Sequence, residues 1–167
     1  MSGVGGAAVR VCEHVSGATM RQMRREDLTA VLEIERRSFA QPWSQPFFEK
    51  ELGTPFARLT VAVEEGPLRD TIVGYTCAWR VTDEVHLLNI AVHPERRGFG
   101  LGRALLESLV EQARAGRARV VFLEVRAGNV VARRLYRQIG FRDLGIRRGY
   151  YGPGQDAVVM ELRLGSR

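Results

Sequence analysis

The chain alternates between stretches with apolar residues at helical spacing and shorter stretches that are apolar and β-prone. Leu101, Leu105, Leu109 and Ala113 recur every four residues, as the buried face of an amphipathic helix does. Ser44 is a suitable N-cap for another helix. On these patterns, helices are predicted over residues 26–39, 44–52, 101–115 and 129–138.

Six stretches carry the continuous or alternating apolar pattern of β-strands. Their predicted ranges are 58–64, 71–81, 84–92, 120–125, 141–149 and 157–164. Short turns separate the first three, which predicts an antiparallel meander. The unbroken apolar run in the fourth predicts a strand covered on both faces.

A further strand, to which the pattern assigns no range, is expected before the first helix. The order is then a strand, two helices, three strands, a helix, a strand, a helix and two strands. It predicts an α/β fold with a mixed, mostly antiparallel sheet and helices on both faces. Residues 1–17 are rich in Gly, Ala and Ser and show no sustained period. We therefore expect a disordered N-terminal tail over 1–17 and a single domain over 18–167.

Composition excludes several classes of protein. The 167 residues are 45% hydrophobic and 26% charged, which is ordinary for a globular chain. No apolar run has the length of a membrane span, and residues 1–17 lack the apolar region of a signal peptide. The two cysteines lie far apart and in no metal spacing, so we expect a reducing cytoplasm and no metal.

The positive charge is almost entirely arginine. The formal net charge is +6, and Lys50 is the only lysine. Arginine forms planar, bidentate contacts with phosphate and carboxylate groups. This balance is compatible with a phosphate-bearing cofactor, a nucleic acid or an acidic protein partner, or with arginines that only solvate helix faces. The low aromatic content, 8%, argues against a single-strand nucleic-acid module.

A glycine-rich turn lies between a predicted strand and a predicted helix. Its residues are Arg97, Gly98, Phe99, Gly100, Leu101, Gly102 and Arg103. Glycines allow a backbone to approach a phosphate closely and to adopt positive φ. The first N–H groups of a helix have no internal partner and favour an anion. The turn therefore predicts a site for a pyrophosphate.

Other phosphate motifs fit less well. A P-loop ends in Gly-Lys-Ser/Thr, and the turn has no lysine. A dinucleotide fingerprint needs a third glycine where Arg103 stands, although Glu124 lies at about the right distance for a ribose-binding acid. A tight turn without a ligand stays open as an alternative. The remaining pattern is R-x-x-G-x-G at a strand-to-helix turn.

Further segments resemble one family. They are Asn89–Val92, Leu123–Asn129, Leu135–Tyr136, Gly140–Phe141 and Ile146–Tyr151, together with Phe39 and Pro42–Ser44. With the glycine-rich turn, they resemble the GNAT family of N-acetyltransferases, most closely its RimI-type ribosomal protein alanine N-acetyltransferases. The resemblance covers about residues 20–164. It implies the GNAT acyl-coenzyme A N-acyltransferase fold and acetyl-coenzyme A as cosubstrate.

The resemblance also implies the residues that bind acetyl-coenzyme A. The turn of residues 97–103 would hold the pyrophosphate, although Gly98 and Phe99 stand where that family commonly has polar or basic residues. Ile90, Ala91 and Val92 would offer backbone hydrogen bonds to the pantetheine arm, on a strand that parts from residues 120–125. Asn129 would bind the same arm, or serve only as a helix N-cap.

Two residues are candidates for proton transfer. Glu124 lies in an otherwise apolar strand, where a carboxylate is costly unless it is paired or functional. The resemblance assigns it as general base and assigns Tyr136 as the general acid for the departing thiolate. The alternatives are a Glu124 that only pairs with Arg126 or another arginine, and a Tyr136 that is only a core aromatic.

The acceptor is expected to be a protein N-terminus. Trp43, Tyr150 and Tyr151 are candidates for the acceptor groove, or Tyr150 and Tyr151 are simply two aromatics on a strand. The resemblance implies the N-terminal alanine of a small-subunit ribosomal protein as acceptor, and a monomer with no direct nucleic-acid role. A lysine or small-molecule amine acetyltransferase, a nucleic-acid-binding module and a non-catalytic acetyl-coenzyme A sensor are the alternatives.

Overall fold

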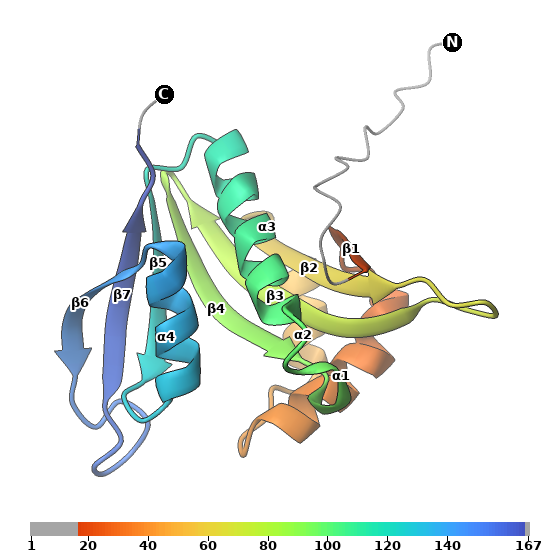
Figure 1. Ribbon diagram of the computed structural model, residues 1–167, viewed down its shortest axis with the longest axis horizontal. Coiled ribbons are helices and arrows are strands. Elements are labelled where there is room, and N and C mark those ends of the chain that lie inside the picture. The colour runs from red at the N-terminus through yellow and green to blue at the C-terminus, as the bar shows by residue number, and fades with distance from the viewer. Residues whose placement is uncertain (1–16, 166–167) are drawn as a thin grey trace.

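The computed structural model describes residues 17–165, and their order of elements confirms the predicted one (Figure 1). The expected tail of residues 1–17 lies, apart from Gly17, outside the described residues. The elements are β1 Ala18–Gln22, α1 Leu28–Ser38, α2 Gln45–Leu52, β2 Ala57–Glu64, β3 Thr71–Val81, β4 Glu84–Val92, α3 Leu101–Ala115, β5 Val120–Arg126, α4 Val130–Ile139, β6 Arg142–Arg147 and β7 Ala157–Arg163. Short 3-10 turns at Arg25–Asp27 and Pro94–Arg96 precede α1 and α3.

The strands form one sheet in the order β1-β2-β3-β4-β5-β7-β6. The predicted meander of β2, β3 and β4 is confirmed, because both of its pairings are antiparallel. Among the described strands only β4 and β5 pair in parallel, since α3 carries the chain across the sheet between them. The sheet is therefore mixed and mostly antiparallel, as predicted.

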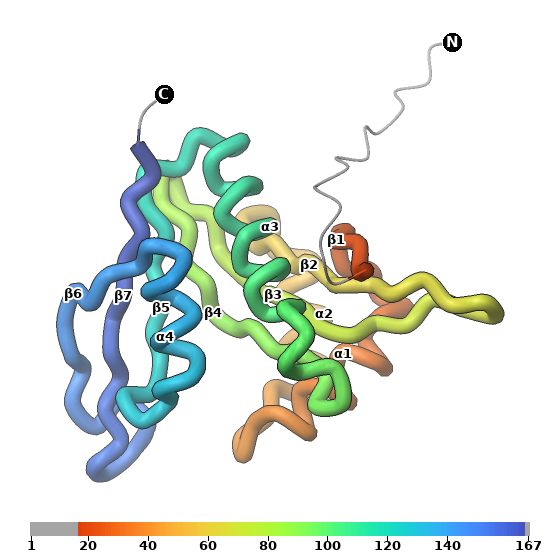
Figure 2. The backbone as a smooth tube through the Cα atoms, in the orientation of Figure 1, coloured from red at the N-terminus to blue at the C-terminus, as the bar shows by residue number. Residues whose placement is uncertain are grey.

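Helices lie on both faces of the sheet (Figures 1 and 2). The helices α3 and α4 cover β4, β5 and β7, and their shared core includes Leu106, Val121 and Met160. On the opposite face α1 and α2 pack on β2, β3 and β4, around Phe48 and Tyr75. The N-terminal part of α3 also packs over β1, β2 and β3, where Leu101 and Leu105 share a core with Ala62 and Val73. The central strands are therefore covered on both faces.

Local signals set the ends of the helices. Ser44 Oγ accepts a hydrogen bond from the Phe47 N–H, 3.4 Å away, and caps α2 as predicted. Asn129 Oδ1 accepts from the Ala132 N–H at 3.1 Å and caps α4. Gly140 ends α4 with φ of +114°, a backbone conformation that residues other than glycine rarely adopt.

The burial of β5 differs from the prediction that both of its faces would be covered. Val121, Leu123 and Val125 are buried under α3 and α4, whereas Val120, Phe122 and Glu124 on the other face are only half-buried. The reason is that α1 and α2 pack over β2, β3 and β4 and do not extend over β5.

The strand predicted over residues 141–149 is shorter than expected. It ends at Arg147, so Tyr150 and Tyr151 lie in the turns between β6 and β7 and not on a strand. Gly149, Gly152 and Gly154 in this connection all have positive φ, which suits turns and interrupts a regular strand.

Candidate active site

The strands β4 and β5 part from each other half-way along their length. Their parallel pairing runs from Glu84 and Val120 to Leu87 and Leu123, while β4 continues to Val92. Cys77 of β3 pairs with Asn89 and Ala78 pairs with Leu87, which leaves Leu88 as the extra residue of a bulge. The bulge bends β4 where the pairing with β5 stops (Figure 1).

The parting exposes one backbone edge of β4 where the sequence predicted a site. Ile90 and Val92 are half-buried, and Ala91 is buried in the core beside α1. Their side chains pack against the protein, so any ligand in the slot meets mainly backbone groups of this segment.

The glycine-rich turn leads from this edge into α3. Gly98 and Gly100 have φ of +85° and +84°, and a Cβ at either position would meet nothing within 4 Å. Among residues 17–165, no side chain caps the N-terminus of α3, so its first N–H groups remain available to an anion. The side chain of Leu101 is buried in the core, which leaves only its backbone to face a ligand.

The arginines of the turn bind to neighbouring parts of the protein. Arg97 donates to the Val92 carbonyl at 3.0 Å and to Ser38 Oγ at 2.9 Å. Arg103 donates to Glu107 at 3.2 Å and to Gln138 at 3.0 Å, and so joins α3 to α4. The turn therefore offers an anion chiefly backbone N–H groups.

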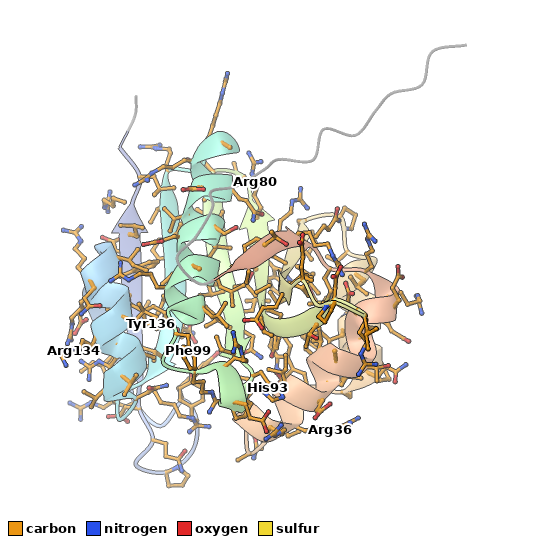
Figure 3. All side chains as sticks on the ribbon, turned by 45° about the vertical axis from the view of Figure 1, so that its right-hand side comes forward. Arg36, Arg80, His93, Phe99, Arg134 and Tyr136 are labelled. Atoms are coloured by element: carbon orange, nitrogen blue, oxygen red, sulfur yellow. The ribbon has the colours of Figure 1, made fainter. Side chains whose placement is uncertain are left out.

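Phe99 lies exposed on the same turn, with the guanidinium of Arg96 5.2 Å from its ring centroid. Figure 3 labels it together with His93 on the connection between β4 and α3. His93 Nδ1 accepts from the Glu95 N–H at 3.2 Å, so this histidine caps the 3-10 turn as a structural residue.

Sequence analysis missed a cationic pocket on α4. It has a volume of about 500 Å³ and is lined by Val130, Arg133, Arg134, Arg137 and Gln138. The spacing of these residues, three and four apart, was the signal that could have found one face. Arg134 points away from the sheet (Figure 3), and the Arg103–Gln138 hydrogen bond links the pocket to the glycine-rich turn.

Glu124 lies at the parted end of β5 in a group of polar side chains. Its side chain is 27% exposed, and its carboxylate pairs with Arg147 Nη1 at 3.1 Å. Tyr150 packs edge-on against Tyr151, with ring centroids 5.0 Å apart. The guanidinium of Arg126 lies 4.2 Å from the ring of Tyr151. The structure thus brings Glu124 together with two of the three predicted acceptor-groove residues.

The three tyrosines of this region hold their protons more tightly than usual. Burial raises the pKa of Tyr136 to about 12, and the neighbouring Tyr151 adds to the effect. Burial and then Glu124 raise the pKa of Tyr151. A hydrogen bond to Glu124 raises the pKa of Tyr150.

Trp43 lies apart from the two tyrosines. It packs against Phe47 and Phe48 of α2, at centroid distances of 4.3 and 5.6 Å. No ring contact joins it to Tyr150 or Tyr151 in the described part of the chain. Its backbone N–H donates to Glu35 Oε1 at 2.9 Å.

Glu35 is a second residue that sequence analysis missed. It lies on α1 and is 1% exposed. The signal was available, because Val31 and Leu32 place position 35 on the apolar face of that helix, where a carboxylate is costly.

The parted edge of β4, the glycine-rich turn and the pocket on α4 are together called the cradle. The cradle fits acetyl-coenzyme A in three respects. It has an open backbone edge on β4, an uncapped helix N-terminus behind two glycines, and a cationic pocket beside them. Within residues 17–165, no three His, Cys, Asp or Glu side chains gather closely enough to hold a metal ion. In that same part of the chain, no helix is long and apolar enough to cross a membrane.

Comparison with known proteins places the chain among acetyltransferases. The model of the acetyltransferase (GNAT) family matches residues 28–141. A Bacillus subtilis protein provisionally assigned as a [ribosomal protein bS18]-alanine N-acetyltransferase is 41% identical over 145 residues, 86% of this chain and 93% of that protein. The [ribosomal protein bS18]-alanine N-acetyltransferase of Salmonella typhimurium is 37% identical over 139 residues, 81% of this chain and 90% of that protein.

A solved structure agrees with these relatives. The crystal structure of the ribosomal-protein-S18-alanine N-acetyltransferase from Escherichia coli superposes with a TM-score of 0.81 at 33% identity. The match covers 90% of this chain and 96% of that one. The fold and the RimI-type resemblance predicted from the sequence are both confirmed.

Gly100→Ala tests the glycine-rich turn. The substitution forces a left-handed φ on a residue with a Cβ, which costs about 1–2 kcal/mol. We expect a lower free energy of unfolding in urea and an acetyl-coenzyme A affinity by calorimetry that is weaker by about tenfold. Gly145→Ala is the control, since its Cβ also meets nothing within 4 Å and its φ is not positive. Equal behaviour of the two variants would contradict the assignment.

The raised pKa of Tyr136 predicts a late titration. The folded value of about 12 exceeds the unfolded value of about 10, so its contribution to stability is complete below pH 10 and is lost as the pH rises through about 12. Phenolate absorbance that wild type shows and Tyr136→Phe lacks should develop only above about pH 11. A midpoint near 10 would contradict the burial effect.

Proposed function

Because the chain belongs to the acetyltransferase (GNAT) family and is an N-acetyltransferase, we propose that it acetylates the N-terminal α-amine of a protein. The donor is acetyl-coenzyme A, and the favoured acceptor is the N-terminal alanine of a small-subunit ribosomal protein. This specificity follows the relatives from Bacillus subtilis, Salmonella typhimurium and Escherichia coli, whose names specify bS18 or S18 alanine.

One observation carries the proposal. The parting of β4 and β5 lies between an anion-binding turn on one side and the Glu124 group on the other. An extended thioester substrate that is anchored at the turn would reach along the β4 edge towards Glu124. An amine could then approach the thioester beside Tyr150 and Tyr151.

Separate parts of the cradle would bind separate parts of acetyl-coenzyme A. The first N–H groups of α3 suit the pyrophosphate, because they carry no other partner and lie at the positive end of the helix dipole. The arginine-lined pocket on α4 suits a further phosphate. The β4 edge suits the amides of the pantetheine arm.

The chemistry requires two proton movements. Attack by a neutral amine on the thioester carbonyl carbon forms a C–N bond and breaks the C–S bond, while the amine loses a proton and the thiolate gains one. An α-amine has an ordinary pKa near 8, so it needs only modest help to become neutral. Glu124 would accept the proton of the amine through water. Tyr136, which is fully protonated at neutral pH, would donate a proton to the departing thiolate.

A peptide panel tests the acceptor. It holds peptides that start with Ala, Ser or Met and have free α-amines, and the same peptides with the α-amine blocked and one internal lysine. We expect acetyl transfer to the free Ala start, measured by mass spectrometry. Transfer confined to the blocked peptides would contradict the proposal and indicate a lysine acetyltransferase. Transfer to none of them would point to a small-molecule amine.

Glu124→Gln and Arg147→Gln separate a base from a structural ion pair. Both substitutions remove the same 3.1 Å pair, but only the first removes the carboxylate. We expect kcat to fall by about 10²–10⁴ in Glu124→Gln and much less in Arg147→Gln. Equal losses would contradict the role of Glu124 as base. Tyr136→Phe should lower kcat with little effect on the KM for acetyl-coenzyme A.

A further inference from the structure

We propose that Glu35 is a positioning residue that locks the loop containing Trp43, a predicted acceptor-groove residue, to the parted segment of β4. Glu35 lies on α1, away from the Glu124 group, and its role rests on the proposed acetyl transfer. It would act by holding two separate walls of the site at a set distance from each other.

Three donors from three parts of the chain converge on its carboxylate. The Trp43 N–H donates to Oε1 at 2.9 Å, and Asn89 Nδ2 donates to Oε2 at 3.1 Å. The hydroxyl of Tyr75 on β3 also donates to Oε2. Glu35 is therefore satisfied on both oxygens, although in the described part of the chain it forms no ion pair.

The link continues into the slot between the strands. Asn89 is the first residue after the Leu88 bulge, at the point where β4 leaves β5. While its Nδ2 binds Glu35, its Oδ1 accepts from the Ile90 N–H at 3.1 Å. A continuous chain of hydrogen bonds thus joins Trp43, Glu35, Asn89 and Ile90, from the loop after α1 to the proposed pantetheine edge.

Stability alone is a weak explanation for this carboxylate. A buried charge is costly, and apolar replacements of buried ionic groups are often neutral or stabilising. Glu51 on α2 shows what a simpler buried carboxylate looks like on the same face of the sheet. It is 3% exposed and accepts from Trp79 Nε1 at 2.7 Å, with no hydrogen bond to β4 or to the loop with Trp43.

The substitution Glu35→Gln should break the link with little change in side-chain volume. If the side-chain oxygen of the new Gln still accepts from the Trp43 N–H, the side-chain NH₂ of that Gln faces the NH₂ of Asn89. Two hydrogen-bond donors then face each other without an acceptor. The β4 segment and the loop with Trp43 then lose their common anchor. Since a misplacement of about 1 Å can cost 10²-fold in rate, we expect kcat/KM for the peptide to fall by about 10- to 100-fold.

The matched control is Glu51→Gln. It removes a buried carboxylate of similar exposure whose side-chain hydrogen bond, among the described residues, goes to Trp79 and not to β4 or the loop with Trp43. We expect its kcat/KM to stay within about twofold of wild type, while both variants show a similar fall in melting temperature. Equal kinetic losses in the two variants, or a Glu35→Gln enzyme within about twofold of wild type, would overturn the proposal.

A double variant, Glu35→Gln with Asn89→Asp, supplies the rescue. It exchanges the amide and the carboxylate across the same contact, so one donor again faces one acceptor, and the carboxylate introduced on β4 can still accept from the Ile90 N–H. We expect most of the lost kcat/KM to return. A double variant whose kcat/KM is no higher than that of Glu35→Gln would also overturn the proposal, because the proposed role depends on the contact between the side chains at positions 35 and 89.

These kinetics are measured with whichever amine the wild-type enzyme acetylates. An error in the acceptor class then appears in the wild-type panel, before any variant is made. An error in the role of Glu35 appears only in the comparison of variants of an active enzyme. The two failures are therefore distinguishable.

Discussion

The rest of this structure depends on the limited pairing of two parallel strands. β4 and β5 share a register only as far as Leu87 and Leu123, because the Leu88 bulge turns β4 away. The core under α3 and α4 runs from β3 across β4 and β5 to β7, whereas the core under α1 and α2 lies on the opposite face of β2, β3 and β4. The opening between the parted ends of β4 and β5 is bordered by backbone on β4 and by the Glu124 group on β5, which is the arrangement that the proposed acetyl transfer requires.

Charge is used differently on the two sides of this opening. On the α3 side, Arg97 and Arg103 bind protein atoms, which leaves the backbone N–H groups of the turn for an anion. On the β5 side, Glu124 is half-buried, paired with Arg147 and surrounded by tyrosines that keep their protons. Glu35 belongs to neither side, and its carboxylate accepts from neutral donors that connect the loop containing Trp43 to β4.

Much of the fold could be predicted from the sequence. The ranges of β3 and β4 match the prediction, and Ser44, Asn129 and Gly140 delimit their helices as expected. These features depend on neighbours a few residues apart, so spacing and capping chemistry reveal them. The glycine-rich turn belongs to the same class, since positive φ and a helix N-terminus are local properties. Resemblance to a family supplied the roles of Glu124 and Tyr136, which stay predictions.

The sequence by itself thus determined the elements, their order, the glycine-rich turn at the start of a helix, and the family. Only the tertiary structure decided that one face of β5 is left half-open, that Arg147 pairs with Glu124, and that Glu35 joins Trp43 to Asn89. These contacts depend on residues from different elements, and Glu35 and Asn89 are 54 positions apart along the chain. Strand register and helix placement bring such residues together, and a sequence pattern over a few neighbouring residues specifies neither the register nor the placement.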